Sequence, residues 1–142
     1  LPVERKLGSG KWPETGEIDI MEHVGHDSGV IHASAHSKDY QWQNGTQKTG
    51  TLKVPDATNT FHVYVLEWTA NELRAYVDDQ LYFRYTNEGK GWSAWPYDQE
   101  FYLILNVAVG GAWGGQKGVD ESAFPQRMEV DYVRVCAPEG AK

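Results

Sequence analysis

The sequence contains almost no cysteine and no long apolar run. Cys136 is the only cysteine in 142 residues, which excludes an intrachain disulfide and a metal site built from several thiolates. Because Cys136 lies in an apolar stretch near the C-terminus, we expect a buried and unreactive thiol. No apolar run approaches the length of a membrane span, and no signal peptide is recognisable.

Basic residues are also scarce. The chain has 13 Lys and Arg against 20 Asp and Glu, which gives a formal net charge of -7 and a pI near 5.1. Nucleic acids and anionic membranes are bound through basic patches, so we expect neither as a partner. An uncharged polymer is compatible with this surface. Six Trp and eight Tyr supply core packing and also flat faces of the kind that suit pyranose rings.

Convincing helical periodicity is missing, whereas short alternating runs and turn residues recur along the chain. The length suits one domain over residues 1–142. We therefore predict an all-β fold, an antiparallel β-sandwich. Three consecutive runs form a predicted meander, the polar stretch 40–60 holds one short strand, and 128–135 is apolar enough for a central strand. The other strands are expected at Val30–Ser37, Phe61–Thr69, Leu73–Val77, Leu81–Tyr85, Phe101–Val109 and Met128–Val135.

Three acids are concentrated in the stretch Glu17-Ile18-Asp19-Ile20-Met21-Glu22. Alternation from Glu17 to Met21 predicts a strand with Glu17 and Asp19 on one face and the isoleucines on the other. A regular strand would send Glu22 into the core, where an unpaired carboxylate is very costly. We therefore predict a β-bulge at Met21, because one extra residue returns Glu22 to the face of the other acids.

Like charges at close quarters destabilise a strand unless the cluster has a use. Retaining cleavage of a glycosidic bond requires one ionised carboxylate as nucleophile and one protonated carboxyl as acid and then base, about 5–5.5 Å apart. Glu17 and Glu22 have the longer side chains and can converge over a concave surface. Asp19, between them, can hydrogen-bond to the nucleophile and hold a proton. The alternative is a solvated strand face, but cross-strand pairing normally mixes charges of both signs.

These residues match the Glu-x-Asp-x-x-Glu signature of glycoside hydrolase family 16, in the bulged form that resembles laminarinases, the endo-β-1,3-glucanases. Further segments resemble the laminarinase pattern in the same order, so the resemblance covers nearly the whole chain. They are Trp12-Pro13, His36, Glu67-Trp68, Trp95-Pro96-Tyr97-Asp98 before Phe101–Val109, Gly110-Gly111-Ala112-Trp113-Gly114-Gly115, and Asp131-Tyr132-Val133-Arg134-Val135.

The resemblance implies a jelly roll with a concave substrate cleft. It implies that Glu17 is the nucleophile, Asp19 its assistant and Glu22 the acid/base of a retaining enzyme acting on β-1,3-glucan or mixed-linkage β-glucan. No cofactor is required for that reaction. The resemblance also implies secretion, although no signal peptide is visible in this chain. Linkage preference, and hydrolysis as opposed to transglycosylation, are not determined by the sequence.

Four further residues are expected to contact substrate. Trp12 and Trp113 line sugar subsites by resemblance, and His36 is a cleft residue able to orient Glu22 or a sugar hydroxyl. Asn106 is either a satisfied core amide or a groove contact. Asp131 is where many family members bind a structural calcium, together with carbonyls from N-terminal strands.

The strands that precede the catalytic strand in the resembled family have no counterpart in residues 1–16. We therefore expect the C-terminal larger part of the domain, with a complementary N-terminal segment or a second chain as a partner for unpaired strand edges. Two alternatives follow. The chain is a non-catalytic β-glucan-binding module, or it is an inactive fragment that needs an N-terminal piece.

Overall fold

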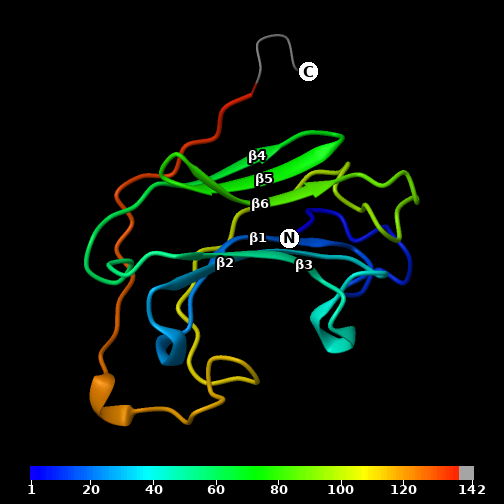
Figure 1. Cartoon of the computed structure of the whole chain (residues 1–142). Coiled ribbons are helices and arrows are strands. Elements are labelled where there is room, and N and C mark those ends of the chain that lie inside the picture. Colours follow the sequence, from blue (N-terminus) through cyan, green and yellow to red (C-terminus); the bar gives the residue numbers. More distant parts are fainter. Residues whose placement is uncertain (138–142) are drawn as a thin grey trace. The chain divides into compact units, whose positions relative to one another are not determined.

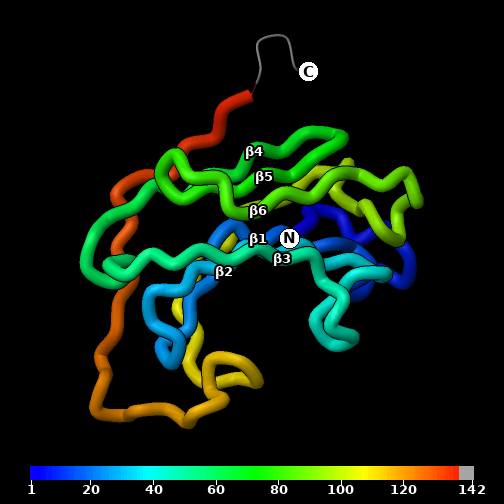
Figure 2. Tube along the Cα trace, viewed as in Figure 1, coloured from blue at the N-terminus to red at the C-terminus, as the bar shows by residue number. Residues whose placement is uncertain are grey.

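The strands of this chain form two antiparallel, three-stranded sheets. The computed structural model describes residues 1–137, and both sheets lie in its first compact unit, Leu1–Ile104. One sheet has the order β1-β2-β3 and the other β4-β5-β6, and Figures 1 and 2 show them stacked face to face. The strands are β1 (Glu17–Glu22), β2 (Val30–His36), β3 (Lys48–Lys53), β4 (Tyr64–Trp68), β5 (Glu72–Val77) and β6 (Gln80–Thr86).

The helical content is limited to three single turns of 3-10 helix within the described residues 1–137. These are η1 (Gly25–Asp27), η2 (Trp42–Asn44) and η3 (Glu121–Ala123). No helix in this part of the chain is long and apolar enough to cross a membrane. The predictions of an all-β fold, of the β4-β5-β6 meander and of one short strand between residues 40 and 60 are confirmed.

The core lies between the two sheets and follows the alternation of the strands. In β5, Leu73, Ala75 and Val77 are buried while the residues between them are only partly buried. The main buried cluster joins both sheets to the segment after β6. Its members are Ala33, Ala35, Leu73, Ala75, Phe83, Tyr85, Trp95 and Tyr97. This packing turns Ala33 and Ala35 of β2 toward the second sheet, so the residues between them lie on the opposite face of β2.

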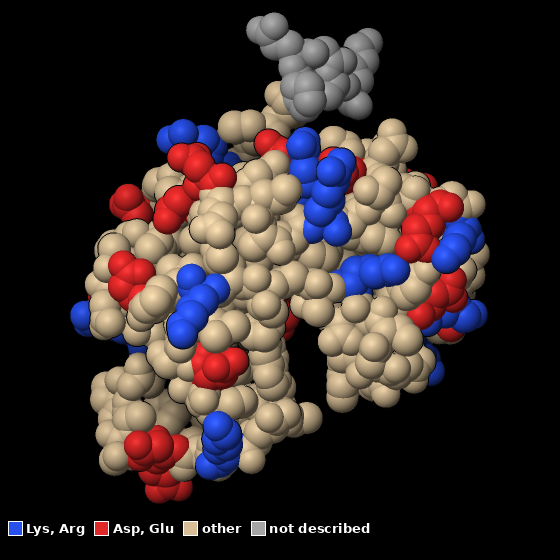
Figure 3. All heavy atoms as spheres, viewed as in Figure 1, with Lys and Arg blue, Asp and Glu red and all other residues tan. Residues whose placement is uncertain are grey.

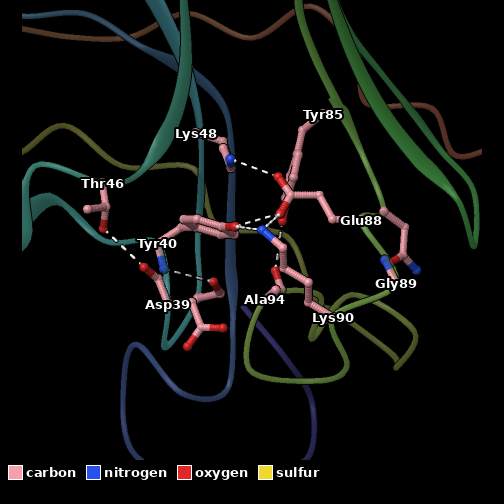
Figure 4. Close-up of polar contacts among 11 residues, drawn as sticks. Asp39, Tyr40, Thr46, Lys48, Tyr85, Glu88, Gly89, Lys90 and Ala94 are labelled. Atoms are coloured by element: carbon pink, nitrogen blue, oxygen red, sulfur yellow. Dashed lines mark hydrogen bonds and ion pairs between the residues drawn. The ribbon is translucent and has the colours of Figure 1, made fainter.

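A charged cluster ties the β2–β3 connection to the segment after β6 (Figure 4). The Tyr40 hydroxyl donates to a Glu88 carboxylate oxygen at 2.6 Å, and Lys48 and Lys90 lie 3.0 and 2.6 Å from the same carboxylate. Lys90, Tyr40 and Lys48 lower the pKa of Glu88 to about 2 by hydrogen bonding. The Lys48 ammonium also lies 3.9 Å from the centroid of the Tyr40 ring, a cation–π contact.

Charges of both signs are interspersed on the face drawn in Figure 3, where blue and red side chains alternate with uncharged surface. The formal net charge is -7. Nothing on this face resembles a basic patch suited to a polyanion.

The second compact unit begins at Leu105, and its described part ends at residue 137. The glycine-rich stretch 110–118 forms turns, and Asp120 caps η3 by accepting a hydrogen bond from the Ser122 amide. The prediction of one domain over 1–142 stays a prediction.

Two predicted strands are wrong. Phe101 forms a single bridge with Pro2, and the remainder of 101–109 and all of 128–135 have no strand assignment. Their apolar side chains are largely exposed, as at Leu105 and Val133. The physical reason is that strand propensity is realised only against a hydrogen-bonded neighbour, and within residues 1–137 no strand pairs with residues 103–109 or 128–135. Cys136, expected to be buried in the last of these strands, is exposed for the same reason.

At Gly50 on β3 the two sheets approach each other closely. A Cβ atom at this position would lie 2.2 Å from the Tyr82 carbonyl oxygen and 3.0 Å from Phe83 Cα, both backbone atoms of β6. Only a residue without a side chain allows this contact.

Gly50→Ala is therefore expected to lower the free energy of unfolding by ~1–3 kcal/mol, the usual cost of overpacking. Gly25→Ala is the matched control, because a Cβ atom there meets nothing within 4 Å. Urea unfolding of both variants measures the difference. Equal stabilities would show that the sheets do not approach each other at Gly50.

Candidate active site

Strand β1 contains the bulge that its sequence predicts. Ile20 and Met21 together occupy the space opposite a single residue of β2, Ala33, and the register shifts between Asp19 and Glu22. The register pairs on either side are Glu17 with His36, Asp19 with Ser34, and Glu22 with His32. All three acids therefore face the same side of the sheet, which confirms that Glu22 returns to the face of Glu17 and Asp19.

The core explains why the extra residue is accommodated at Met21. Ile18 packs against the main buried cluster, and Met21 packs against a second one formed by Ile31, Val54 and Val77. In a regular strand Glu22 would follow Ile18 and Ile20 to that apolar side. The bulge places the partly buried Met21 side chain against this cluster in place of the Glu22 carboxylate, which removes a large desolvation cost.

Glu17 lies at the start of β1 and is partly buried. Its carboxylate accepts a hydrogen bond from the Trp12 indole N–H. Burial raises the pKa of Glu17 above its ordinary value, and the charge of Asp19 adds to that effect. The Trp12 hydrogen bond and the charge of His36 act in the opposite direction, because both stabilise the ionised carboxylate.

Asp19 has His36 as its partner. Its Oδ2 lies 3.2 Å from His36 Nε2, and His36 is buried at the end of β2. Burial by itself would lower the pKa of His36, but the hydrogen bond to Asp19 and the charges of Asp19, Glu17 and Glu22 raise it. The bond that we expected from Asp19 to Glu17 is not among the hydrogen bonds of the described chain, 1–137. Asp19 instead favours a charged imidazole among the acids.

Glu22 has fewer stabilising contacts than Glu17. Its carboxylate lies 3.4 Å from the Ser34 hydroxyl, which is also 3.0 Å from the Thr49 hydroxyl. Burial raises the pKa of Glu22 to about 7, with contributions from the charges of Asp19 and Glu17 that outweigh the opposing effects of His36 and Ser34. A carboxyl group with this pKa can be protonated near neutral pH and can both donate and take up a proton.

The site thus combines two carboxyl groups in different environments. Glu17 has an indole donor and a neighbouring imidazole, whereas Glu22 has one long contact to a hydroxyl. Two acids in unlike environments are the arrangement that separates a nucleophile from a proton donor. Ligand atoms of Glu17, Asp19 and His36 also lie within 4.8 Å of one another, close enough for a metal ion.

The comparison with protein families places the chain in a family. The model of the glycosyl hydrolases family 16 matches residues 6–134, which is most of the chain. The chain belongs to glycosyl hydrolases family 16. The predicted resemblance to glycoside hydrolase family 16 is thereby confirmed.

Individual relatives in family 16 include glucanases and one galactosidase. The chain is 54% identical to a beta-glucanase from Rhodothermus marinus over 140 residues, covering 95% of this chain and 49% of that protein. It is 39% identical to a keratan-sulfate endo-1,4-beta-galactosidase from Sphingobacterium multivorum, covering 89% of this chain and 29% of that protein.

The fold is also that of a laminarinase. The X-ray structure of the laminarinase from Rhodothermus marinus matches with a TM-score of 0.86 at 52% identity, over 88% of this chain and 52% of that chain. The prediction of a jelly roll is confirmed by this match. The chain spans about half the length of these Rhodothermus relatives.

The structure gathers only part of the predicted site. Trp12 and His36 lie with the three acids, and their rings are 5.9 Å apart between centroids. Asn106, Trp113 and Asp131 belong to the second unit. Their expected contacts with substrate or calcium stay predictions, as do the concave cleft and the substrate contacts of Trp12 and His36.

Two neighbours of Glu22 were missed by the sequence. Ser34 could have been found, because alternation along β2 places it on the face of His36, opposite Asp19. Tyr82 could not, because its hydroxyl reaches the Ile20 carbonyl from the other sheet, 62 residues away. A contact between sheets leaves no local pattern in the sequence.

The raised pKa of Glu22 makes stability depend on pH. The folded chain binds the proton more tightly than the unfolded chain, so this contribution is complete below about pH 4.5 and is lost as pH rises through about 7. One pKa unit corresponds to ~1.4 kcal/mol.

Glu22→Gln removes the group whose ionisation causes that loss. Between pH 4.5 and pH 8 the free energy of unfolding of the variant, relative to that of the parent, is expected to rise by about 1–2 kcal/mol. The full pKa shift corresponds to ~3 kcal/mol, which is reduced here because Glu22 is partly exposed to solvent. Chemical unfolding at both pH values measures this. Glu100→Gln, at an exposed position, is the control. If the difference in free energy of unfolding between Glu22→Gln and the parent were the same at both pH values, the raised pKa of Glu22 would be contradicted.

Proposed function

We propose that this chain carries the catalytic residues of a retaining endo-β-glucanase, which cleaves β-1,3-glucan of the laminarin type or mixed-linkage β-glucan by double displacement. The observation that carries the proposal is that Glu22, with a pKa near 7, shares one strand face with Glu17. A retaining mechanism needs such a pair, one carboxyl ionised and the other protonated.

The surroundings of the two acids support a definite assignment of roles. Trp12 donates to Glu17 and His36 supplies positive charge beside it, so that ionised Glu17 is the better stabilised of the two carboxylates. Among the described residues 1–137, the long contact to the Ser34 hydroxyl is the one hydrogen bond of the Glu22 carboxylate. The shared proton therefore resides on Glu22, which makes Glu17 the nucleophile and Glu22 the acid. Asp19 assists by holding His36 beside both.

The proposed reaction has two steps. In the first, a Glu17 oxygen bonds to the anomeric carbon while the glycosidic bond breaks and the Glu22 proton moves to the leaving oxygen. In the second, Glu22 takes a proton from water, the water oxygen bonds to the same carbon, and Glu17 is released. Neither step uses a cofactor, because the carboxyl groups supply both the nucleophile and the proton.

The β-glucan substrate is proposed from the relatives. The Rhodothermus protein is named a beta-glucanase, and its solved counterpart a laminarinase. The Sphingobacterium relative acts on a different polymer according to its name, which shows that family membership alone does not fix the sugar. Secretion is proposed together with the substrate, because an enzyme must leave the cell to reach a polysaccharide outside it.

A structural calcium at Asp131 remains a proposal with little support from this chain. Calcium takes six to eight oxygen ligands. Among residues 1–137 the group close enough to hold a metal is Glu17, Asp19 and His36, which does not include Asp131 and contains an imidazole. No step of the proposed reaction depends on this ion.

A complementary N-terminal segment or a second chain is also proposed as a partner, and a chain that is inactive without this partner is the version to be tested against the main proposal. Residues 103–109 and 128–135 carry exposed apolar side chains without strand partners in the described part of the chain. Such segments gain stability when another strand pairs with them. A reducing-sugar assay on laminarin, with and without an added N-terminal piece, separates this version from a chain active alone. The non-catalytic binding module is not favoured, because all three acids are retained on one face.

Glu17→Gln tests the nucleophile. Because the amide cannot attack the anomeric carbon, we expect turnover of laminarin to fall by about 10⁴-fold or more while folding and glucan binding persist. Release of reducing ends and affinity electrophoresis in laminarin measure the two properties. Glu100→Gln, remote from β1 in sequence and exposed, should retain full activity. Hydrolysis by Glu17→Gln at the rate of the parent would overturn the assignment.

A further inference from the structure

The bulge in β1 leaves backbone groups without partners in its own sheet. Ile20 and Met21 face the single residue Ala33, so the ladder between β1 and β2 is interrupted there. A buried carbonyl without a partner is costly, and a bulge persists only where something else satisfies it. The position of Glu22 depends on this local geometry, because Glu22 is the next residue in the chain.

The partner comes from the opposite sheet. The Tyr82 hydroxyl, on β6, donates to the Ile20 carbonyl oxygen at 2.8 Å. Tyr82 packs against both buried clusters, so its ring is held by side chains from the two sheets. Burial raises the pKa of Tyr82, and the charge of Glu22 contributes to the shift. The hydroxyl therefore stays protonated and donates at every working pH.

The backbone of Tyr82 packs against β3. Its carbonyl oxygen lies 2.2 Å from the position that a Cβ atom of Gly50 would take, so β3 and β6 are in close contact there, and Gly50 pairs with Ala33, the residue opposite the bulge. A hydroxyl on a rigid strand can fix the point that it binds, whereas one on a mobile loop cannot. Tyr82 thus connects the packing of the two sheets to the backbone that carries Glu22.

We propose that Tyr82 is a positioning residue for the acid/base: by binding the Ile20 carbonyl, it fixes the bulge and so the direction in which Glu22 leaves β1. This inference rests on the proposed function for its catalytic consequence. The structural part, that Tyr82 holds the bulge, is independent of any activity. Tyr82 need not touch the substrate for this role.

Tyr82→Phe removes the hydroxyl and keeps the ring that packs in the core. We expect kcat on laminarin to fall by about 10- to 100-fold with little change in KM, because misplacing the proton donor affects the transition state more than binding. Amide hydrogen exchange at Met21 and Glu22, followed by NMR, should be about fivefold to tenfold faster than in the parent.

Tyr85→Phe is the matched control. Tyr85 lies on the same strand, and its hydroxyl donates to another backbone carbonyl, that of Ala94, at 3.0 Å. This variant loses the same type of bond away from β1. We expect it to lose stability without the selective fall in kcat and without faster exchange at Met21 and Glu22.

The two measurements separate the inference from the proposed function. If the parent chain, with or without an N-terminal piece, hydrolyses no β-glucan, the proposed function fails, and the exchange rates still decide whether Tyr82 holds the bulge. Unchanged exchange at Met21 and Glu22 in Tyr82→Phe would overturn the inference. Equal falls in kcat for the Tyr82 and Tyr85 variants would also overturn it, because the effect would then be general destabilisation.

Discussion

One extra residue in strand β1 is the constraint on which the site depends. Without it, Glu22 would continue the alternation of Ile18 and Ile20 into the core, where an unpaired carboxylate is very costly. With it, Met21 packs in the core and Glu22 joins Glu17 on the outer face. A bulge costs ladder hydrogen bonds, and the hydroxyl of Tyr82 on the other sheet satisfies one of the groups that it frees. The site therefore depends on the packing of both sheets.

Grouping three acids on one face is itself unfavourable, and the neighbouring residues offset part of that cost. Trp12 donates to Glu17, and His36 lies 3.2 Å from Asp19 with its own pKa raised by the surrounding acids. Glu22 has one long contact to the Ser34 hydroxyl, and burial raises its pKa to about 7. The burial and repulsion that reduce stability at alkaline pH thus also keep Glu22 protonated near neutrality. This is an exchange of stability for chemical function.

The sequence predicted those features that depend on local patterns. Glu22 breaks the alternation of polar and apolar residues, which predicts the bulge. The polar turns between 61 and 85 predict the β4-β5-β6 meander. Features that depend on distant partners were predicted poorly. The strands expected at 101–109 and 128–135 have no neighbouring strand in the described chain apart from the single bridge at Phe101, so propensity alone does not form them, and Cys136 is exposed with them. Likewise, neither the pairing of Asp19 with His36 nor the contact from Tyr82 has a signature in the surrounding residues.

The most direct test of this account is a site-specific titration of Glu22 by carbon-13 NMR of its carboxyl group in the intact chain. Assignment by comparison with Glu22→Gln identifies the resonance. The account predicts a midpoint near pH 7, because burial and the charges of Asp19 and Glu17 act together on a carboxyl held beside them by the bulge. A midpoint at the ordinary value for glutamate, about 4.3, would show that Glu22 does not belong to the acid cluster. That result would contradict the account at its foundation.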